Sequence, residues 1–107
     1  MPYRVEYHQK AVDQLEEITR GDNKSALAIA DAIDELAKNP RPKGVEKISH
    51  LLFRIRTRDY RVIYGIEDQE HLVGVLKIER RNETTYKNLG NISERFKRMI
   101  NDLDNNK

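Results

Sequence analysis

The strongest constraint on the fold is the segment 51–86, where three runs of strand-forming residues are separated by two short polar turns. In the first run apolar residues alternate with basic ones. Because the side chains of a strand point to opposite faces in turn, one face of this run is apolar and the other carries arginines. Asp59 lies in the first turn, and residues 67–70 form the second. The pattern predicts a three-stranded, mainly antiparallel meander.

The two faces of this meander should differ in character. We expect the apolar face to pack against helices, and its members are Phe53, Ile55, Val62, Tyr64, Leu72, Leu76 and Ile78. The opposite face should display Arg54, Arg56 and Arg61. Residues 72–76 are apolar on both sides, so periodicity alone leaves the face of the third strand open.

The part of the chain before the meander predicts one strand and a two-helix hairpin. Residues 3–7 alternate as a short N-terminal strand. Residues 10–18 and 24–38 have apolar side chains at helical spacing. Asp22 or Asn23 lies between them and is expected to cap the second helix, because a short polar side chain can accept a hydrogen bond from the first helical turn.

A basic connector, residues 41–50, leads into the meander. After the meander, a short C-terminal helix is expected from about residue 93 to about residue 103, with Ser93 as its N-cap. The order of elements predicts an α+β fold in which the helices pack most simply on one face of the sheet. The length of 107 residues is that of one domain, so we expect a single domain over residues 1–107.

Composition narrows the classes of function. The chain has no cysteine, and its three histidines lack the spacing of metal ligands, so neither a metal nor another cofactor is expected. It has no apolar run of membrane-spanning length and no signal-like N-terminus, so we expect a cytoplasmic protein without a membrane partner. The net charge is only +2, but residues 41–61 hold seven basic and two acidic side chains. This local positive charge indicates a phosphate-rich partner.

The segment FRIRTRDYRVIY, followed after the last strand by an Arg-Arg pair and a tyrosine, resembles the RelE/ParE superfamily of small toxins from type II toxin–antitoxin modules. The order of elements agrees, and the resemblance covers nearly the whole chain. It implies a RelE-like fold of the microbial-RNase type. The connector departs from the family pattern, because Lys47-Ile48 is followed by Ser49-His50 where the family often has a glycine.

The resemblance implies two activities for the same fold. RelE-like members cut messenger RNA in the ribosomal A site, where the 2′-hydroxyl attacks the adjacent phosphate without a metal ion. ParE-like members inhibit DNA gyrase instead. We expect the RelE-like activity, with a gyrase inhibitor and a non-catalytic RNA-binding relative as alternatives. The resemblance also implies a cognate antitoxin that covers the arginines or displaces the last helix, a toxin that is monomeric alone, and an oligomeric complex with the antitoxin.

Cleavage by a 2′-hydroxyl needs a base, cations for the phosphate and a proton for the leaving oxygen. By resemblance, the catalytic residues are Arg54, Arg56, Arg61, Arg81 and Tyr86. The expected RNA-binding residues are Lys47, Arg58 and Arg80, of which Arg80 is also an alternative to Arg81. The base stays open: Tyr86 is assigned stacking or base, and Glu79 and Glu83 are alternative bases.

Overall fold

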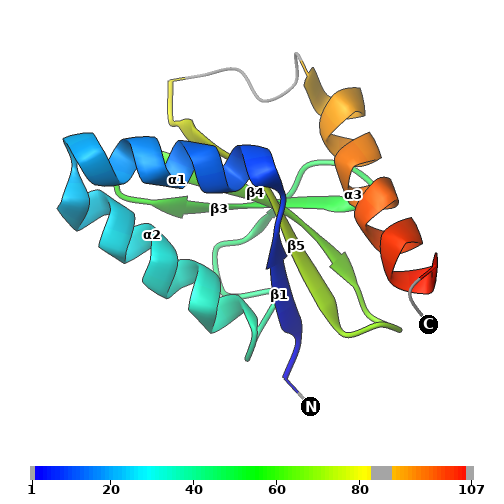
Figure 1. The fold of residues 1–107 in the computed structure, drawn as a ribbon. Helices are drawn as coiled ribbons and strands as arrows, with labels where there is room; N and C mark the ends of the chain where they lie inside the picture. The colour runs from blue at the N-terminus through cyan, green and yellow to red at the C-terminus, as the bar shows by residue number, and fades with distance from the viewer. Residues whose placement is uncertain (1, 83–87, 106–107) are drawn as a thin grey trace.

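The computed structural model describes residues 2–82 and 88–105. The elements, in chain order, are β1 (Arg4–Tyr7), α1 (Gln9–Gly21), α2 (Asn23–Leu36), β2 (Glu46–Lys47), β3 (Leu52–Thr57), β4 (Tyr60–Glu67), β5 (Leu72–Arg80) and α3 (Leu89–Asn105). The strands form one five-stranded sheet in the order β1-β5-β4-β3-β2. β1 runs parallel to β5, and the other neighbours are antiparallel. Helices α1 and α2 lie on one face of the sheet, and α3 lies on the other (Figure 1).

The α+β class, the N-terminal strand, the helical hairpin and the meander are confirmed. Asp22 serves both helices of the hairpin: its N–H donates to the Ile18 carbonyl at 2.6 Å, and its side chain accepts from Ser25 N at 3.1 Å. The prediction for the last helix was wrong in two respects. The helix begins at Leu89, so Ser93 lies inside it, and it packs on the face away from α1 and α2. Strand β2 was not predicted.

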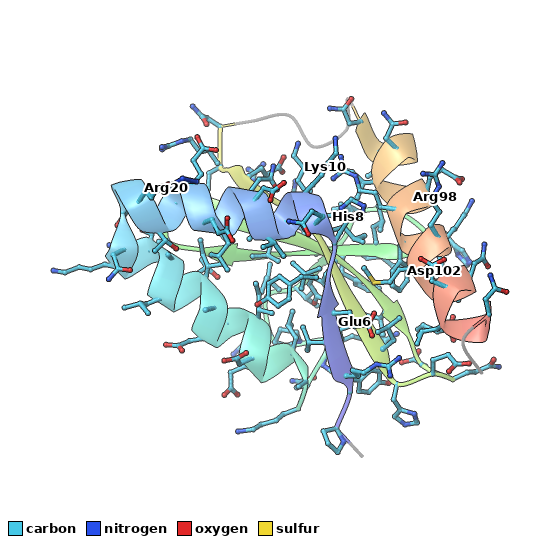
Figure 2. All side chains as sticks on the ribbon, viewed as in Figure 1. Glu6, His8, Lys10, Arg20, Arg98 and Asp102 are labelled. Atoms are coloured by element: carbon cyan, nitrogen blue, oxygen red, sulfur yellow. The ribbon has the colours of Figure 1, made fainter. Side chains whose placement is uncertain are left out.

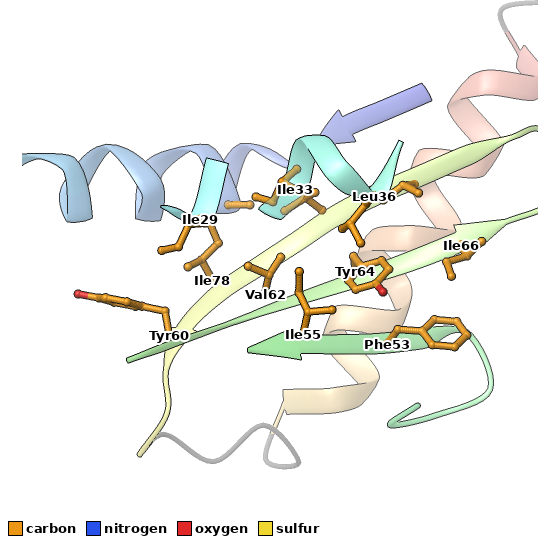
Figure 3. Close-up of a cluster of buried hydrophobic side chains, with 13 residues drawn as sticks. Ile29, Ile33, Leu36, Phe53, Ile55, Tyr60, Val62, Tyr64, Ile66 and Ile78 are labelled. Carbon is orange, nitrogen blue, oxygen red and sulfur yellow. The ribbon is translucent and has the colours of Figure 1, made fainter. Parts of the chain in front are cut away.

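The core beneath α1 and α2 joins the two helices to β3, β4 and β5 (Figure 3). Its buried members are Ala11, Ile29, Ile33, Leu36, Phe53, Ile55, Tyr60, Val62, Tyr64, Ile66, Val73, Val75 and Ile78. A second cluster fills the space beneath α3 and consists of Leu52, Ile63, Leu72, Leu76, Ile92 and Phe96. The placement of Leu72 and Leu76 on the face of the helical hairpin was therefore wrong.

A β-bulge in β5 explains how the two faces are composed. Ile63 is opposite Lys77 and Tyr64 is opposite Val75, so Leu76 is an extra residue without a cross-strand partner. The extra residue reverses the alternation of side chains that follows it. Ile78 consequently joins the core beneath α1 and α2, while Leu76 and Lys77 lie on the face of α3.

Helix α3 approaches the sheet closely because β4 and β5 each have a glycine there. Gly65 and Gly74 are directly opposite each other. A Cβ atom at Gly65 would lie 2.3 Å from the ring of Phe96, and one at Gly74 would lie 2.8 Å from the same ring. The Phe96 side chain is fully buried against these two backbones, so the glycines determine where the helix docks.

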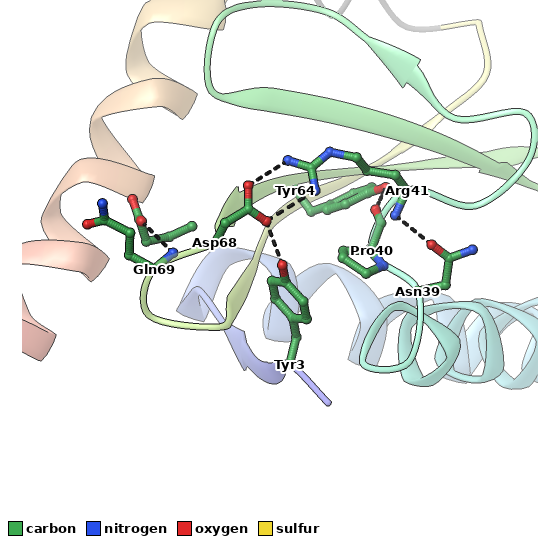
Figure 4. A network of polar contacts seen from close by, with 8 residues as sticks. Tyr3, Asn39, Pro40, Arg41, Tyr64, Asp68 and Gln69 are labelled. Atoms are coloured by element: carbon green, nitrogen blue, oxygen red, sulfur yellow. Dashed lines mark hydrogen bonds and ion pairs between the residues drawn. The ribbon is translucent and has the colours of Figure 1, made fainter. Parts of the chain in front are cut away.

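A polar network holds the start of the connector against the sheet (Figure 4). The Arg41 guanidinium donates to both carboxylate oxygens of Asp68, at 3.1 and 3.0 Å, and the Tyr3 hydroxyl donates to Asp68 Oδ1 at 2.5 Å. These hydrogen bonds, from Arg41 first and then from Tyr3, lower the pKa of Asp68. The buried Tyr64 hydroxyl donates to the Pro40 carbonyl at 2.7 Å. The connector therefore leaves α2 along a defined path toward β2.

The outer surface of the helices is charged. Lys10 and Arg20 on α1 and Arg98 and Asp102 on α3 are exposed and point away from the sheet (Figure 2). Within residues 2–82 and 88–105, none of the helices combines the length and the hydropathy that crossing a membrane requires.

Candidate active site

Arginines from two neighbouring strands meet on the face of the sheet that also carries α3. Arg54 and Arg56 are two residues apart in β3 and so share a face. Arg56 is directly opposite Arg61 of β4. Arg56 is exposed and Arg61 is half-buried. Like charges directly opposite each other destabilise a sheet, so this pair costs stability and creates a site that attracts an anion.

Arg54 is on the predicted face, but it is not displayed to solvent as expected. Its side chain is only 10% exposed, and Nη2 donates to Glu46 Oε2 at 2.9 Å. Glu46 lies opposite it in β2, with a side chain that is 58% exposed. The hydrogen bond and the charge of Arg54 lower the pKa of Glu46, and the charges of Arg61 and Arg56 lower it further. Glu46 is thus an accessible, ionised carboxylate beside the arginines, and sequence reasoning missed it.

Arg81 shares a hollow with Arg61 at the end of the sheet. The hollow has a volume of about 430 Å³, and its lining residues are Asp59, Arg61, Arg80, Arg81 and Asn82. The Arg81 N–H donates to the Asp59 carbonyl at 2.9 Å, which extends the ladder between β4 and β5 as far as the β3–β4 turn. Two of the predicted catalytic arginines, Arg61 and Arg81, therefore border one concave surface.

Two of the predicted RNA-binding residues have their charges on the other side of the sheet. Arg80 lies opposite Tyr60, and its guanidinium is 5.4 Å from the centre of that ring. Lys47 lies opposite Phe53, and its ammonium is 5.9 Å from the centre of that ring. Both rings belong to the face covered by α1 and α2. Neither cation converges with Arg54 and Arg56. Successive side chains of a strand point to opposite faces, and each of these two residues is next in its strand to a residue that points to the arginine face.

Arg58, the third predicted RNA-binding residue, has a structural contact. It occupies the β3–β4 turn with a φ of 56°. Its Nε donates to Ser25 Oγ at 2.9 Å, which connects the turn to the start of α2. Ser25 Oγ in turn donates to Asp22 Oδ2 at 2.6 Å. The charge of Arg58 is therefore directed toward the helical hairpin.

The bulge in β5 brings two further charged residues to the arginine face. Glu79 is directly opposite Arg61, and its side chain is 0% exposed. The Lys77 ammonium is 3.3 Å from Glu79 Oε2 and is 14% exposed. A carboxylate closed off from solvent is not accessible to a substrate hydroxyl, which argues against Glu79 as the base. Sequence reasoning did not name Lys77 as a site residue.

Two predicted residues lie outside the described part of the chain: Tyr86 and the alternative base Glu83. Among residues 2–82 and 88–105, no three His, Asp or Glu side chains are grouped closely enough to hold a metal ion.

Solved structures of known proteins share this fold. A complex of archaeal RelE and RelB from Pyrococcus horikoshii OT3 aligns with a TM-score of 0.66 at 25% identity, over 78% of this chain and 100% of that one. The RelBE2 toxin–antitoxin complex of Mycobacterium tuberculosis aligns with a TM-score of 0.65 at 21% identity, over 76% and 100%. The isolated RelE toxin of E. coli aligns with a TM-score of 0.65 at 17% identity, over 91% and 98%.

Sequence comparison identifies the family. A search of curated proteins gives no match. The family described as the ParE toxin of the type II toxin–antitoxin system, parDE, matches residues 5–85, which is most of the chain and extends from within β1 past the end of β5. The chain is therefore a member of the ParE toxin family of type II toxin–antitoxin systems, within the RelE/ParE superfamily.

Proposed function

We propose that this toxin is a ribosome-dependent messenger RNA endoribonuclease. The observation that carries the proposal is the direct opposition of Arg56 and Arg61 on an accessible face, with the ionised carboxylate of Glu46 beside them. An interaction surface for a protein does not require two guanidinium groups facing one point. Two guanidinium groups that face one point suit a phosphate, because each can donate two parallel hydrogen bonds to the phosphate oxygens.

The arginines act on the phosphate at which the strand is cut. Attack of the 2′-hydroxyl gives a pentacoordinate phosphorus that carries more negative charge than the starting diester. The sheet holds Arg56 and Arg61 directly opposite each other before the reaction begins, so both cations are already on one face when this charge develops. Arg81, which borders the same hollow as Arg61, adds a third cation. Arg54 acts one step away, through its hydrogen bond to Glu46.

We assign proton removal to Glu46. Its carboxylate is exposed and ionised near neutral pH, and the hydrogen bond from Arg54 fixes one of its oxygens. Glu46 takes the proton of the 2′-hydroxyl, the 2′-oxygen forms a bond to phosphorus, and the bond from phosphorus to the 5′-oxygen breaks. The departing 5′-oxygen takes a proton from solvent. The products are a 2′,3′-cyclic phosphate and a 5′-hydroxyl. Tyr86 stays a prediction, either as a base-stacking residue or as the base in place of Glu46.

The proposal includes two partners, the ribosome and an antitoxin. A net charge of +2 allows few phosphate contacts, so free RNA should be bound weakly, and the ribosome would hold the message instead. The P. horikoshii and M. tuberculosis structures are both toxin–antitoxin complexes. By analogy, a cognate antitoxin would cover the arginine face with an acidic segment or displace α3, and the complex would be an oligomer.

A second candidate function is that of a gyrase inhibitor, and the family match favours it because that family is described as a ParE toxin. Such a toxin leaves messenger RNA intact. The two functions therefore differ in a direct observable.

The test is primer extension on a defined message in a cell-free translation system, with Arg61→Ala, Arg56→Ala and Glu46→Gln compared with wild type. Loss of one preorganised donor lowers the rate of such reactions by about 10²–10³-fold, so we expect losses of this size for the two arginines. Arg98→Ala is the matched control, because Arg98 is an exposed arginine on α3. Cutting by Arg61→Ala at the rate of Arg98→Ala would refute the assignment. Intact message with wild type would refute the nuclease function.

A further inference from the structure

We propose that Glu79 is a positioning residue that fixes the guanidinium of Arg61 for phosphate binding, and that the bulge in β5 is what places it there. The inference rests on the proposed nuclease function and adds to it a residue that never contacts the RNA. It concerns a buried carboxylate in the middle of a cationic surface, which the cleavage steps above leave without a role.

The burial of Glu79 requires compensation by nearby cations. Its side chain is 0% exposed, and an ionised carboxylate withdrawn from water is costly unless cations and hydrogen bonds replace the water. The Lys77 ammonium is 3.3 Å from Oε2. Arg61 is the residue directly opposite in β4. Lys77 from its own strand therefore supplies one cation at contact distance, and the residue directly opposite in β4 carries a second positive charge.

The register forms a row across three strands: Arg56 in β3, Arg61 in β4 and Glu79 in β5. Directly opposite residues of antiparallel strands have Cβ atoms about 4.5–5.5 Å apart, so each member of the row interacts with the next. Arg56 repels Arg61 from one side, and Glu79 attracts it from the other. The two forces act in the same direction and hold the Arg61 side chain toward Glu79, which leaves room for a phosphate between the two arginines.

The row exists only because of the bulge. Without the extra residue, Glu79 would point into the core beneath α1 and α2, and Ile78 would replace it beside Arg61. The backbone groups released by the bulge are satisfied by side chains. Arg95 Nη1 of α3 donates to the Leu76 carbonyl at 3.0 Å, and Gln14 Oε1 of α1 accepts from Ile78 N at 2.8 Å. Bulges with this effect are common beside active sites, where they redirect side chains.

A double-mutant cycle on the full-length toxin tests the inference. The variants are Glu79→Gln, Arg61→Ala and the combination, with Glu16→Gln on the exposed surface of α1 as the matched control. If Glu79 acts through Arg61, Glu79→Gln lowers the rate of ribosome-dependent cutting at least tenfold in the wild type and less than twofold in the Arg61→Ala background. A role only in stability would give equal losses in both backgrounds, and that result would overturn the inference.

A second readout does not depend on cutting. A fixed guanidinium gives a slowly exchanging proton–nitrogen correlation signal for its Nε–H group in an NMR spectrum. We expect Glu79→Gln to weaken and shift this signal for Arg61, while Glu16→Gln leaves it unchanged. The pair Glu79→Gln with Lys77→Met avoids an uncompensated buried lysine, and it should lose the signal as well. If the Glu79→Gln, Lys77→Met double variant folds and its Arg61 signal is unchanged, the inference is overturned. If wild type leaves message intact, the proposed function fails, and this readout still decides the role of Glu79.

Discussion

Replacement of Gly65 by alanine is a direct test of how α3 is held on the sheet. The added Cβ would lie 2.3 Å from Cδ2 and 2.5 Å from Cε2 of the Phe96 ring, well inside van der Waals contact. The obstructing atoms belong to a rigid ring that is itself fully buried, so it cannot rotate away without moving the helix.

The size of the effect is bounded by two cases. If the ring and the helix shift by a few tenths of an ångström, the cost is that of overpacking a core, about 1–3 kcal/mol. If α3 leaves the sheet, the burial of Phe96 and Ile92 is lost, at about 1.5–3 kcal/mol for each side chain. We therefore expect the free energy of unfolding of Gly65→Ala to fall by about 1–3 kcal/mol, since the smaller rearrangement is favoured. For a domain of this size, that is a fall in Tm of roughly 4–8 °C per kcal/mol.

The assay is urea unfolding followed by circular dichroism, with Gly90→Ala as the control. A Cβ at Gly90 meets nothing within 4 Å, and the residue lies in the first turn of α3, so alanine should leave stability unchanged or raise it slightly. Phe96→Leu in the Gly65→Ala background should recover part of the loss, because it removes the obstructing ring. Equal unfolding midpoints for Gly65→Ala and Gly90→Ala would refute the account of the close approach.

Three further predictions concern stability. Asp68→Asn removes the ion pair with Arg41, and because the pair is so exposed, the loss of stability should be no more than about 1 kcal/mol. The partners hold the Asp68 pKa below its unfolded value, so this difference from wild type should be present at about pH 6 and vanish as pH falls through the folded pKa. Urea unfolding at both ends of this pH range checks it. Tyr64→Phe leaves the Pro40 carbonyl without its buried donor, so we expect a loss of about 1–2 kcal/mol in the same assay, and a loss near zero would contradict the hydrogen bond. Asp22→Ala removes the N-cap of α2 and should lower the thermal midpoint, whereas Asp22→Asn should retain most of it.

The arginine face could be predicted because β3 is regular. Its alternation from Leu52 to Thr57 is unbroken, and the next strand begins after a two-residue turn, so period two alone places Arg54, Arg56 and Arg61 on one side. The helical hairpin was predictable for a similar reason, since Asp22 lies between two amphipathic segments. In each case the determinant is local in sequence.

The parts that sequence reasoning missed depend on contacts between distant residues. The bulge in β5 is satisfied by Gln14 and Arg95, which belong to two different helices. No local pattern in residues 72–80 marks it, because the strand is apolar on both sides where the bulge occurs. Because of this one extra residue, Leu72 and Leu76 lie on the opposite face from Ile78. Glu46 was missed because β2 has only two residues and is recognised only by its pairing with β3.

The measurement that tests the central claim most directly is primer extension on one message incubated with wild-type toxin, with and without translating ribosomes. The account predicts discrete cuts in phase with codons when ribosomes translate, and intact RNA when they are absent. It also predicts that the 5′ fragments end in a 2′,3′-cyclic phosphate. Intact message in both samples, together with loss of supercoiling activity when the toxin is added to purified gyrase, would contradict the account and establish the gyrase inhibitor instead.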